Sequence, residues 1–512
     1  MNGPVLVILP HNPGDVVMAL QAIGRLKADR PLISFDYMVS EECRSLVEGS
    51  PVIRNAHIIP RRPLKEAWDR NDASAAVALV EAFLLSLADT QYELSLNLFQ
   101  ERFGGIIQSF VTAGRKVGLE LIQVDEGGNF RITSRYLEHL FAIPASRHDN
   151  AWHAVDIYIR AARQALNHLA PIPECNPRPR TRRDAKPFPV LPALKRPDAC
   201  SHLSIDSYLV FHPGSAWAGK RWPERHWAGL ASACLGAGLS MVFTGAPEER
   251  PVMDRILAQL PPGPRDRLID CVGKTDLLGA AWLMANARFV VTGDTVAMHL
   301  AAAAGTPAIA LFGASNPIET GPYGLGHIVL QTDPDPLPDL ALDQENRGLA
   351  GLSPEGIAAF ILEGVLEERL PDNVLAWQTD WDMDRDMQIL VDARRRPHPD
   401  SLRGESLLQT LDRGHDSQGK GGKASDTLGA RRRLRAAIDG ALSRPDAQNL
   451  AALESAERDL AKETQASLIW EAYRIAVNGL PLRDLARHLA LRRSRFEMAL
   501  DEERQAANPA IT

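Results

Sequence analysis

Apolar positions along this chain follow two spacing patterns, one typical of strands and one typical of helices, and the two patterns alternate. Short segments such as Val5–Leu9 and Tyr92–Asn97 have the length and apolar content of strands. Longer segments such as Val16–Leu26 and Ala151–Leu169 repeat apolar residues at helical spacing. Strands that alternate with helices indicate a parallel, doubly wound sheet. Further strands are expected at Ile33–Val39, Ala56–Ile59 and Lys116–Leu119, and further helices at Glu41–Glu48, Ala73–Ala88 and Phe103–Ala113.

A second alternation of the same kind begins at Tyr208, so the chain is predicted to contain two Rossmann-like domains. Its expected strands are Tyr208–Phe211, Ser240–Thr244, Leu268–Asp270, Phe289–Thr292, Ala308–Phe312 and Ile328–Leu330. Its expected helices are Arg225–Gly236, Glu249–Gln259, Leu277–Asn286 and Ala297–Ala304. A helix at Pro354–Arg369 is expected to close this second domain.

The segments between and after the two alternations differ in composition. Pro171–Pro197 is rich in Pro and Arg and is typical of a linker. Residues 428–512 have helical periodicity and predict a helical appendage, in which Pro481–Leu500 fits an amphipathic helix pair better than a helix-turn-helix. The predicted division is a first Rossmann-like domain at 1–170, a linker at 171–200, a second Rossmann-like domain at 201–370, a connecting segment at 371–427 and a helical appendage at 428–512.

Composition narrows the class of protein. The chain has 512 residues, which is too many for one core. A net charge of −7 argues against a dedicated nucleic-acid binder. Its five cysteines are scattered without a CxxC pair, which favours reduced thiols over a disulfide framework or a zinc site. The chain enters a strand soon after Met1, so no signal peptide is expected, and no apolar run approaches the ~20 residues of a membrane span.

Two glycine-containing regions carry the candidate chemistry. In the first, the strand at Val5–Leu9 leads through Gly14 into a helix that is expected to open just after Asp15. In the second, loops after predicted strands contain His212–Glu224 and Thr292–Pro307. A loop between a strand and a helix leaves backbone N–H groups and the positive helix end available to an anion. The sequence therefore predicts a cleft between two α/β domains that holds a phosphate-bearing donor.

The order of these motifs is similar to that of glycosyltransferase family 9, the bacterial heptosyltransferases of the lipopolysaccharide inner core. The resemblance covers about residues 4–370 and includes the early Gly-Asp-Val, HPGS…KRWPE, the turn at 243–249, Val-Gly-Lys-Thr at 272–275, the segment 293–315 and Thr-Gly-Pro-Tyr-Gly at 320–324. It implies a GT-B fold with the donor in the C-terminal domain and the acceptor mainly in the N-terminal domain.

Asp15 is the predicted general base. An inverting sugar transfer needs a carboxylate that removes the proton of the acceptor hydroxyl. The resemblance and the place of Asp15 at a strand end favour this role over that of a helix N-cap. The loop residues Asn12 and Gly14 are expected on the acceptor side.

Lys220 is the predicted partner of the departing diphosphate, because an ammonium offsets the negative charge that develops there. Gly214 and Ser215 offer a close backbone N–H and a hydroxyl to the same phosphates. The helix start at Gly293–Thr295 adds an anion site. Its Asp294 either caps the helix or binds a sugar hydroxyl.

Two further donor contacts are predicted. His299 lies one turn inside the helix, where a lone histidine is usually a core residue, but the resemblance favours a donor contact. Glu248 and Glu249 follow a strand end where a ribose would lie, and either ribose binding or stabilisation of the next helix dipole would explain them.

The leading hypothesis is an inverting transferase that moves heptose from ADP-heptose to an inner-core acceptor. The nucleotide-sugar is a substrate, and no cofactor or metal is expected, because no DxD-like pair lies in a suitable loop. The partner is a glycolipid acceptor, at the cytoplasmic side and peripheral to the inner membrane. The alternatives are a transferase with another donor or a protein acceptor, and a non-catalytic sugar-nucleotide scaffold that uses the helical appendage.

The N-terminal half also carries basic residues that either bind phosphorylated sugars and anionic head groups or form solvated faces. They are Arg25, Lys27, Arg30, Arg61, Arg62, Lys65, Arg102, Arg115 and Lys116.

Overall fold

The structure is a computed structural model of the chain. It describes residues 3–119, 122–124, 130–132, 152–169, 188–200, 208–332, 348–363, 370, 374–382 and 387–392, apart from 11, 89, 100–103, 105–106, 109–110, 262–265 and 314 inside those ranges. The predicted appendage at 428–512 lies outside the described residues, as does most of the predicted linker.

The chain forms two compact units, and both large sheets belong to the first, which comprises 1–119, 136–143 and 147–404. The second unit comprises 120–135, 144–146 and 405–512, and its described part is the antiparallel pair of β6 (Ile122–Val124) and β7 (Phe130–Ile132). Within the first unit, we call the elements from β1 to α6, without β6 and β7, the N-terminal lobe. The elements from η2 to β15 form the C-terminal lobe.

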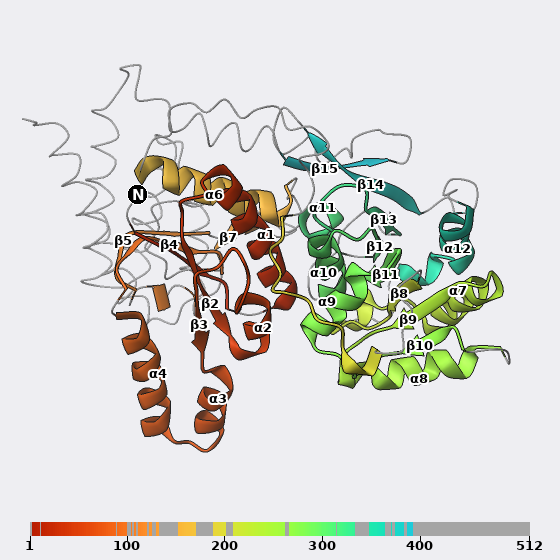
Figure 1. Ribbon diagram of the computed structural model, residues 1–512, viewed down its shortest axis with the longest axis horizontal. Helices are drawn as coiled ribbons and strands as arrows, with labels where there is room; N and C mark the ends of the chain where they lie inside the picture. Colours follow the sequence, from red (N-terminus) through yellow and green to blue (C-terminus); the bar gives the residue numbers. More distant parts are fainter. Residues whose placement is uncertain are drawn as a thin grey trace, which may run out of the picture. The chain divides into compact units, whose positions relative to one another are not determined.

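The N-terminal lobe is built on a parallel sheet with the strand order β3-β2-β1-β4-β5 (Figure 1). This order places β1 in the middle, so the loop after β1 lies at the centre of the sheet's carboxyl edge. The elements are β1 Val5–Ile8, α1 Pro13–Asp29, β2 Phe35–Ser40, η1 Glu41–Cys43, α2 Arg44–Val47, β3 Asn55–Ile59, α3 Arg61–Asp69, α4 Ala73–Ala88, β4 Tyr92–Asn97, β5 Ala113–Gly118 and α6 Ala154–Leu169.

The C-terminal lobe contains a larger sheet with the order β10-β9-β8-β11-β12-β13-β14-β15, in which β14 and β15 are antiparallel. Its first elements are η2 Asp198–Cys200, β8 Tyr208–His212, η3 Ala218–Lys220, α7 Glu224–Gly236, β9 Ser240–Phe243, η4 Pro247–Glu249, α8 Arg250–Gln259 and β10 Leu268–Asp270. They are followed by α9 Leu277–Ala285, β11 Phe289–Gly293, α10 Val296–Ala304, β12 Ala308–Phe312, α11 Pro317–Thr320, β13 Ile328–Gln331, η6 Leu349–Gly351, α12 Pro354–Glu363, β14 Leu375–Asp382 and β15 Met387–Asp392.

Alternate residues of the central strands enter different cores, as the two-residue period of a strand requires. Val5 and Val7 face the core that contains α1 and α6, whereas Leu6 and Ile8 face the core that contains α4. In β8, Tyr208 and Val210 share the first of these cores, together with residues of α9 and α10. One continuous apolar core therefore joins the two lobes on the side of α1 and α10.

The predicted α/β class and its two Rossmann-like sheets are confirmed, and most predicted elements differ from the observed ones by one to three residues. The predicted helix at 103–113 lies partly outside the described residues, and its end was wrong because β5 begins at Ala113. Four described cysteines, Cys43, Cys200, Cys234 and Cys271, are free and buried, which agrees with core thiols.

The sequence analysis did not predict α3, α11, the β6–β7 pair or the β14–β15 hairpin. Helix α3 has a basic first turn and few apolar residues, so its pattern carried little helical signal. The hairpin of β14 and β15 lies in what was expected to be a connecting segment. Polar residues interrupt its strands, yet it pairs antiparallel with β13 and extends the sheet. Among the described residues, no helix is both long and apolar enough to cross a membrane.

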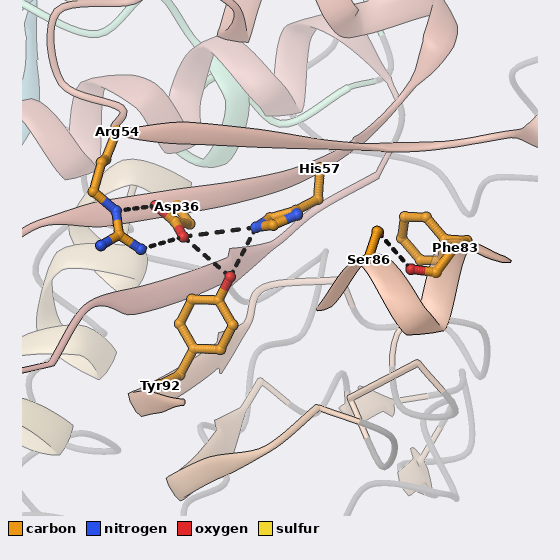
Figure 2. A network of polar contacts seen from close by, with 6 residues as sticks. All are labelled: Asp36, Arg54, His57, Phe83, Ser86 and Tyr92. Carbon is orange, nitrogen blue, oxygen red and sulfur yellow. Dashed lines mark hydrogen bonds and ion pairs between the residues drawn. The ribbon is translucent and has the colours of Figure 1, made fainter. Parts of the chain in front are cut away.

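A buried carboxylate ties together three strands of the N-terminal sheet (Figure 2). Asp36 on β2 is fully buried and accepts two hydrogen bonds from Arg54, at 2.8 and 2.7 Å. The hydroxyl of Tyr92 donates to Asp36 at 3.0 Å and lies 2.8 Å from Nε2 of His57. Burial alone would raise the pKa of Asp36, but the hydrogen bonds from Arg54, His57 and Tyr92 outweigh burial and hold the pKa well below its usual range.

We predict that Asp36→Asn lowers the free energy of unfolding by about 2 kcal/mol, the worth of hydrogen bonds to a charged group. Because the folded pKa is depressed, the stabilisation is fully present above the unfolded pKa of about 4 and is lost progressively as the pH falls from there through the lower folded pKa. Urea unfolding should therefore show a smaller difference between variant and wild type at pH 3 than at pH 7. The control is Glu42→Gln, which breaks the exposed pair with Arg61 and should cost less than about 0.5 kcal/mol. Equal losses from the two variants would contradict this prediction.

Candidate active site

The loop predicted to lie on the acceptor side is found where β1 passes into α1. Helix α1 begins at Pro13, two residues before Asp15, so the expected helix start just after Asp15 was wrong. The N-cap position is occupied by Asn12, whose φ of 63° is in the left-handed region. The side chain of Asn12 donates to Oδ2 of Asp15 at 3.1 Å. Asp15 is therefore a partly buried first-turn carboxylate rather than the N-cap.

Gly14 brings this loop against the C-terminal lobe. A Cβ atom at Gly14 would lie 2.9 Å from Cδ2 of His299 on α10, so a side chain at this position would force the His299 ring or one of the two helices to shift. Helices α1 and α10 also pack against each other. The sequence-predicted residues Gly14 and His299, which are 285 positions apart, are thus neighbours in the structure.

The predicted diphosphate ligand Lys220 is paired with a carboxylate. Its Nζ lies 2.5 Å from Oδ2 of Asp294, and the Asp294 side chain is only 7% exposed. Burial would raise the pKa of Asp294, but Lys220 outweighs it and the pKa is lowered. Asp294 was predicted either to cap α10 or to bind a sugar hydroxyl. Because Thr295 occupies the N-cap position and Asp294 accepts a hydrogen bond from Lys220, Asp294 is not the cap of α10.

The start of α10 keeps features of an anion site. Among the described residues, Thr295 makes no side-chain cap hydrogen bond, and its hydroxyl lies 3.1 Å from the hydroxyl of Thr292. A Cβ at Gly293 would lie 3.0 Å from the backbone oxygen of Lys220, so Gly293 permits the Lys220 loop to approach β11. Backbone N–H groups at the start of α10 and the Lys220 ammonium therefore lie at the same edge of the sheet.

His299 is buried and neutral at physiological pH. Burial lowers its pKa to about 4, and the neighbouring Lys220 adds to this, while Asp294 acts in the opposite direction. Its Nδ1 has no hydrogen-bond partner among the described residues. A neutral imidazole with an unsatisfied nitrogen at this edge can accept or donate one hydrogen bond to a ligand.

The other residues predicted to contact the donor lie in the loops after β8 and β9. Ser215 is buried, and its hydroxyl accepts from the backbone N–H of Trp217 at 3.3 Å. Gly214 lies directly against the carboxylate of Glu249, and a side chain there would overlap it. The predicted Glu248 is exposed, whereas Glu249 points inward and accepts from the backbone N–H of Ala246 at 2.8 Å.

His212 is a residue of this region that the sequence analysis did not single out. Its Nε2 lies 3.9 Å from Oε2 of Glu249, and burial lowers its pKa while Glu249 raises it. The signal available in the sequence was its position at the end of a strand, directly before Pro-Gly-Ser. The sequence also could not tell which of the adjacent Glu248 and Glu249 points inward, because both follow the same turn. Within the described part of the chain, no three His, Cys, Asp or Glu side chains gather as a metal site.

Comparison with known proteins gives the same family as the motifs. The sequence model of "Glycosyltransferase family 9 (heptosyltransferase)" matches residues 127–347. Lipooligosaccharide heptosyltransferase 2 of Haemophilus influenzae is 27% identical over 324 residues, which is 62% of this chain and 85% of that protein. Lipopolysaccharide heptosyltransferase 1 of Pseudomonas aeruginosa is 28% identical over 337 residues, or 64% and 84% of the two chains.

Solved structures share the fold. The family 9 glycosyltransferase from Veillonella parvula superimposes with a TM-score of 0.54 at 20% identity, covering 69% of this chain and 95% of that one. The ADP-heptose LPS heptosyltransferase II of E. coli gives a TM-score of 0.51 at 22% identity, covering 70% and 97%.

The two Rossmann-like lobes that meet at α1 and α10 have the GT-B fold of these solved structures. The family model and the curated relatives support a glycosyltransferase that is similar to the family 9 heptosyltransferases. The expected fold and family are therefore confirmed.

We predict that Lys220→Met destabilises the protein by about 3 kcal/mol, because it leaves the buried Asp294 carboxylate without its partner. Adding Asp294→Asn should restore most of this loss, since the uncompensated charge is then removed. Thermal and urea unfolding of the single and the double variant measure the loss of stability and its recovery. The control is Arg225→Met on α7, where the side chain is exposed and the effect should stay below about 0.5 kcal/mol. A double variant no more stable than Lys220→Met would contradict the pairing.

Proposed function

We propose that this protein transfers heptose from ADP-heptose to an inner-core glycolipid acceptor, with inversion at the anomeric carbon. The observation that carries this proposal is the approach of Gly14 to His299. It sets the first turn of α1, with Asp15, beside the start of α10, where Lys220 and Asp294 pair. The named relatives act on lipopolysaccharide or lipooligosaccharide, and one solved relative is named for ADP-heptose.

The proposed mechanism is a single displacement. The Asp15 carboxylate, oriented by Asn12, accepts the proton of the acceptor hydroxyl as its oxygen attacks the anomeric carbon. The bond to the diphosphate breaks on the opposite side of that carbon. Lys220 and the backbone N–H groups at the start of α10 stabilise the charge that develops on the leaving diphosphate.

The Lys220–Asp294 pair determines how the donor enters. In the structure, Asp294 neutralises Lys220, so a diphosphate must share or replace this partner. We propose that Gly214, Ser215, Gly293, Thr295 and His299 complete the donor site. Glu248 and Glu249 in the turn after β9 are the candidates for ribose binding, and the inward position of Glu249 favours Glu249 over the exposed Glu248.

The positive charge from Lys220 and α10 supplies what a divalent ion would otherwise supply to the diphosphate, so we propose a metal-independent reaction. The acceptor is a membrane-associated glycolipid, and we place the protein at the cytoplasmic face of the inner membrane through peripheral contact. Arg25 is not available for that contact, because it is 6% exposed and bonded to Tyr323.

Asp15→Asn tests the base. We expect turnover with ADP-heptose and an inner-core acceptor to fall at least about 100-fold, with the KM for the donor nearly unchanged, because the amide cannot accept the proton. The matched control is Asp29→Asn at the other end of α1, which breaks the pair with Arg163 far from Asp15 and should keep wild-type turnover. Wild-type turnover of Asp15→Asn would rule out this assignment.

Donor identity is tested separately by thermal shift. A true donor present at 100 times its Kd should stabilise the protein by about 2.7 kcal/mol. We expect this shift with ADP-heptose and not with UDP-glucose or GDP-mannose at the same concentration. The same shift with a different nucleotide-sugar and none with ADP-heptose would replace the proposed donor.

A further inference from the structure

Tyr323 lies where the C-terminal lobe meets two helices of the N-terminal lobe. It follows α11 in the Thr-Gly-Pro-Tyr-Gly turn and is 5% exposed. Its hydroxyl donates to Oδ1 of Asp156, on α6, at 2.6 Å. The same hydroxyl accepts from Nη1 of Arg25, on α1, at 3.1 Å. One phenol oxygen therefore links a turn of the C-terminal lobe to α1 and α6 at once.

The turn that carries Tyr323 is itself held by the β14–β15 hairpin. The side chain of Gln388 donates to the backbone oxygen of Pro322 at 3.1 Å and accepts from the backbone N–H of Gly324 at 2.6 Å. The backbone N–H of Gln388 donates to Oδ2 of Asp156 at 3.0 Å. Both carboxylate oxygens of Asp156 are thus bound by donors from the C-terminal lobe.

The charged groups of this network are buried and therefore need partners within the protein. Arg25 and Asp156 are 6% and 4% exposed, so their charges depend on these partners rather than on water. The Arg25 guanidinium stacks on the ring of Trp381 in β14 at 4.4 Å from the centroid. Burial raises the pKa of Tyr323 well above its usual range, so its hydroxyl stays protonated and remains a donor.

The same helix carries the proposed base. Arg25 follows Asp15 by ten residues, which is about 15 Å along a helix at 1.5 Å per residue. Near its start, α1 touches the C-terminal lobe through Gly14 and His299. A helix fixed at two separated points can neither slide nor rotate freely against the opposite lobe.

We propose that Tyr323 is a positioning residue for glycosyl transfer: by joining Arg25 and Asp156, it fixes α1 against the C-terminal lobe and so places the Asp15 carboxylate opposite the Lys220–Asp294 pair. This inference rests on the proposed function of Asp15. Tyr323 does not contact the reacting groups in this role. It acts through the axis and register of α1.

Tyr323→Phe in the full chain removes only the bridging hydroxyl and keeps the ring. We expect kcat to fall at least about tenfold, because a displacement of about 1 Å at a catalytic group can cost 100-fold. The donor KM should change less than about twofold, since the donor contacts lie in the C-terminal lobe. The matched control is Tyr208→Phe, whose buried hydroxyl donates to the backbone oxygen of Leu283 within that lobe, at 2.8 Å. It should keep wild-type kcat.

A double variant separates positioning from a general loss of stability. If Tyr323 acts through Asp15, Tyr323→Phe should lower kcat less than about twofold when Asp15 is already Asn, because the group to be positioned is absent. An unchanged kcat in the single variant, or the same fold-loss in both backgrounds, would overturn the inference.

Hydrogen exchange provides a readout that does not depend on turnover. The Val16 amide donates to the Asn12 oxygen at 3.1 Å in the first turn of α1. We expect it to exchange at least about fivefold faster in Tyr323→Phe than in wild type, and to be unchanged in Tyr208→Phe. Equal exchange in all three proteins would overturn the positioning role. A wild-type protein that transfers no heptose would instead overturn the proposed function, and the exchange result would still decide the role of Tyr323.

Discussion

One contact between the two lobes, at the first turn of α1, depends on the absence of a side chain. Gly14 has no Cβ, and this allows the first turn of α1 to lie against the His299 ring. If the two helices were pushed apart, Asp15 and the Lys220–Asp294 pair would no longer share one edge, although each lobe would keep its own sheet. The site thus depends on a steric constraint that neither lobe satisfies alone.

Electrostatics on the two sides of this contact are arranged differently. Around Lys220, a buried carboxylate and an ammonium neutralise each other directly. At the Tyr323 junction, a neutral phenol accepts a hydrogen bond from the Arg25 cation and donates one to the Asp156 anion. The phenol oxygen therefore links α1 and α6 within a buried contact.

Sequence periodicity was sufficient for the two sheets, because strands such as β1 and β8 are buried on both faces and alternate with the apolar, buried helices α1 and α10. The motif order was sufficient for the family, and it selected Gly14, Lys220 and His299 before their proximity was known. What it could not give were relations between distant residues. The sequence around Tyr323 and around Gln388 does not indicate that both residues bind Asp156. The polar residues of β14 obscure its strand pattern, and β14 is partly buried only because it pairs with β13.

The β14–β15 hairpin also has a bearing on how this protein can be shortened. Truncating the chain after α12 would remove β14, which covers the hydrogen-bonding edge of β13 along Ile328–Gln331. Without it, a buried apolar strand would present unpaired backbone groups to solvent and invite edge-to-edge association between molecules. A truncated form that ends beyond Asp392 keeps β14 and β15, so the edge of β13 stays covered. A form that ends near residue 370 lacks both strands and should be prone to aggregation.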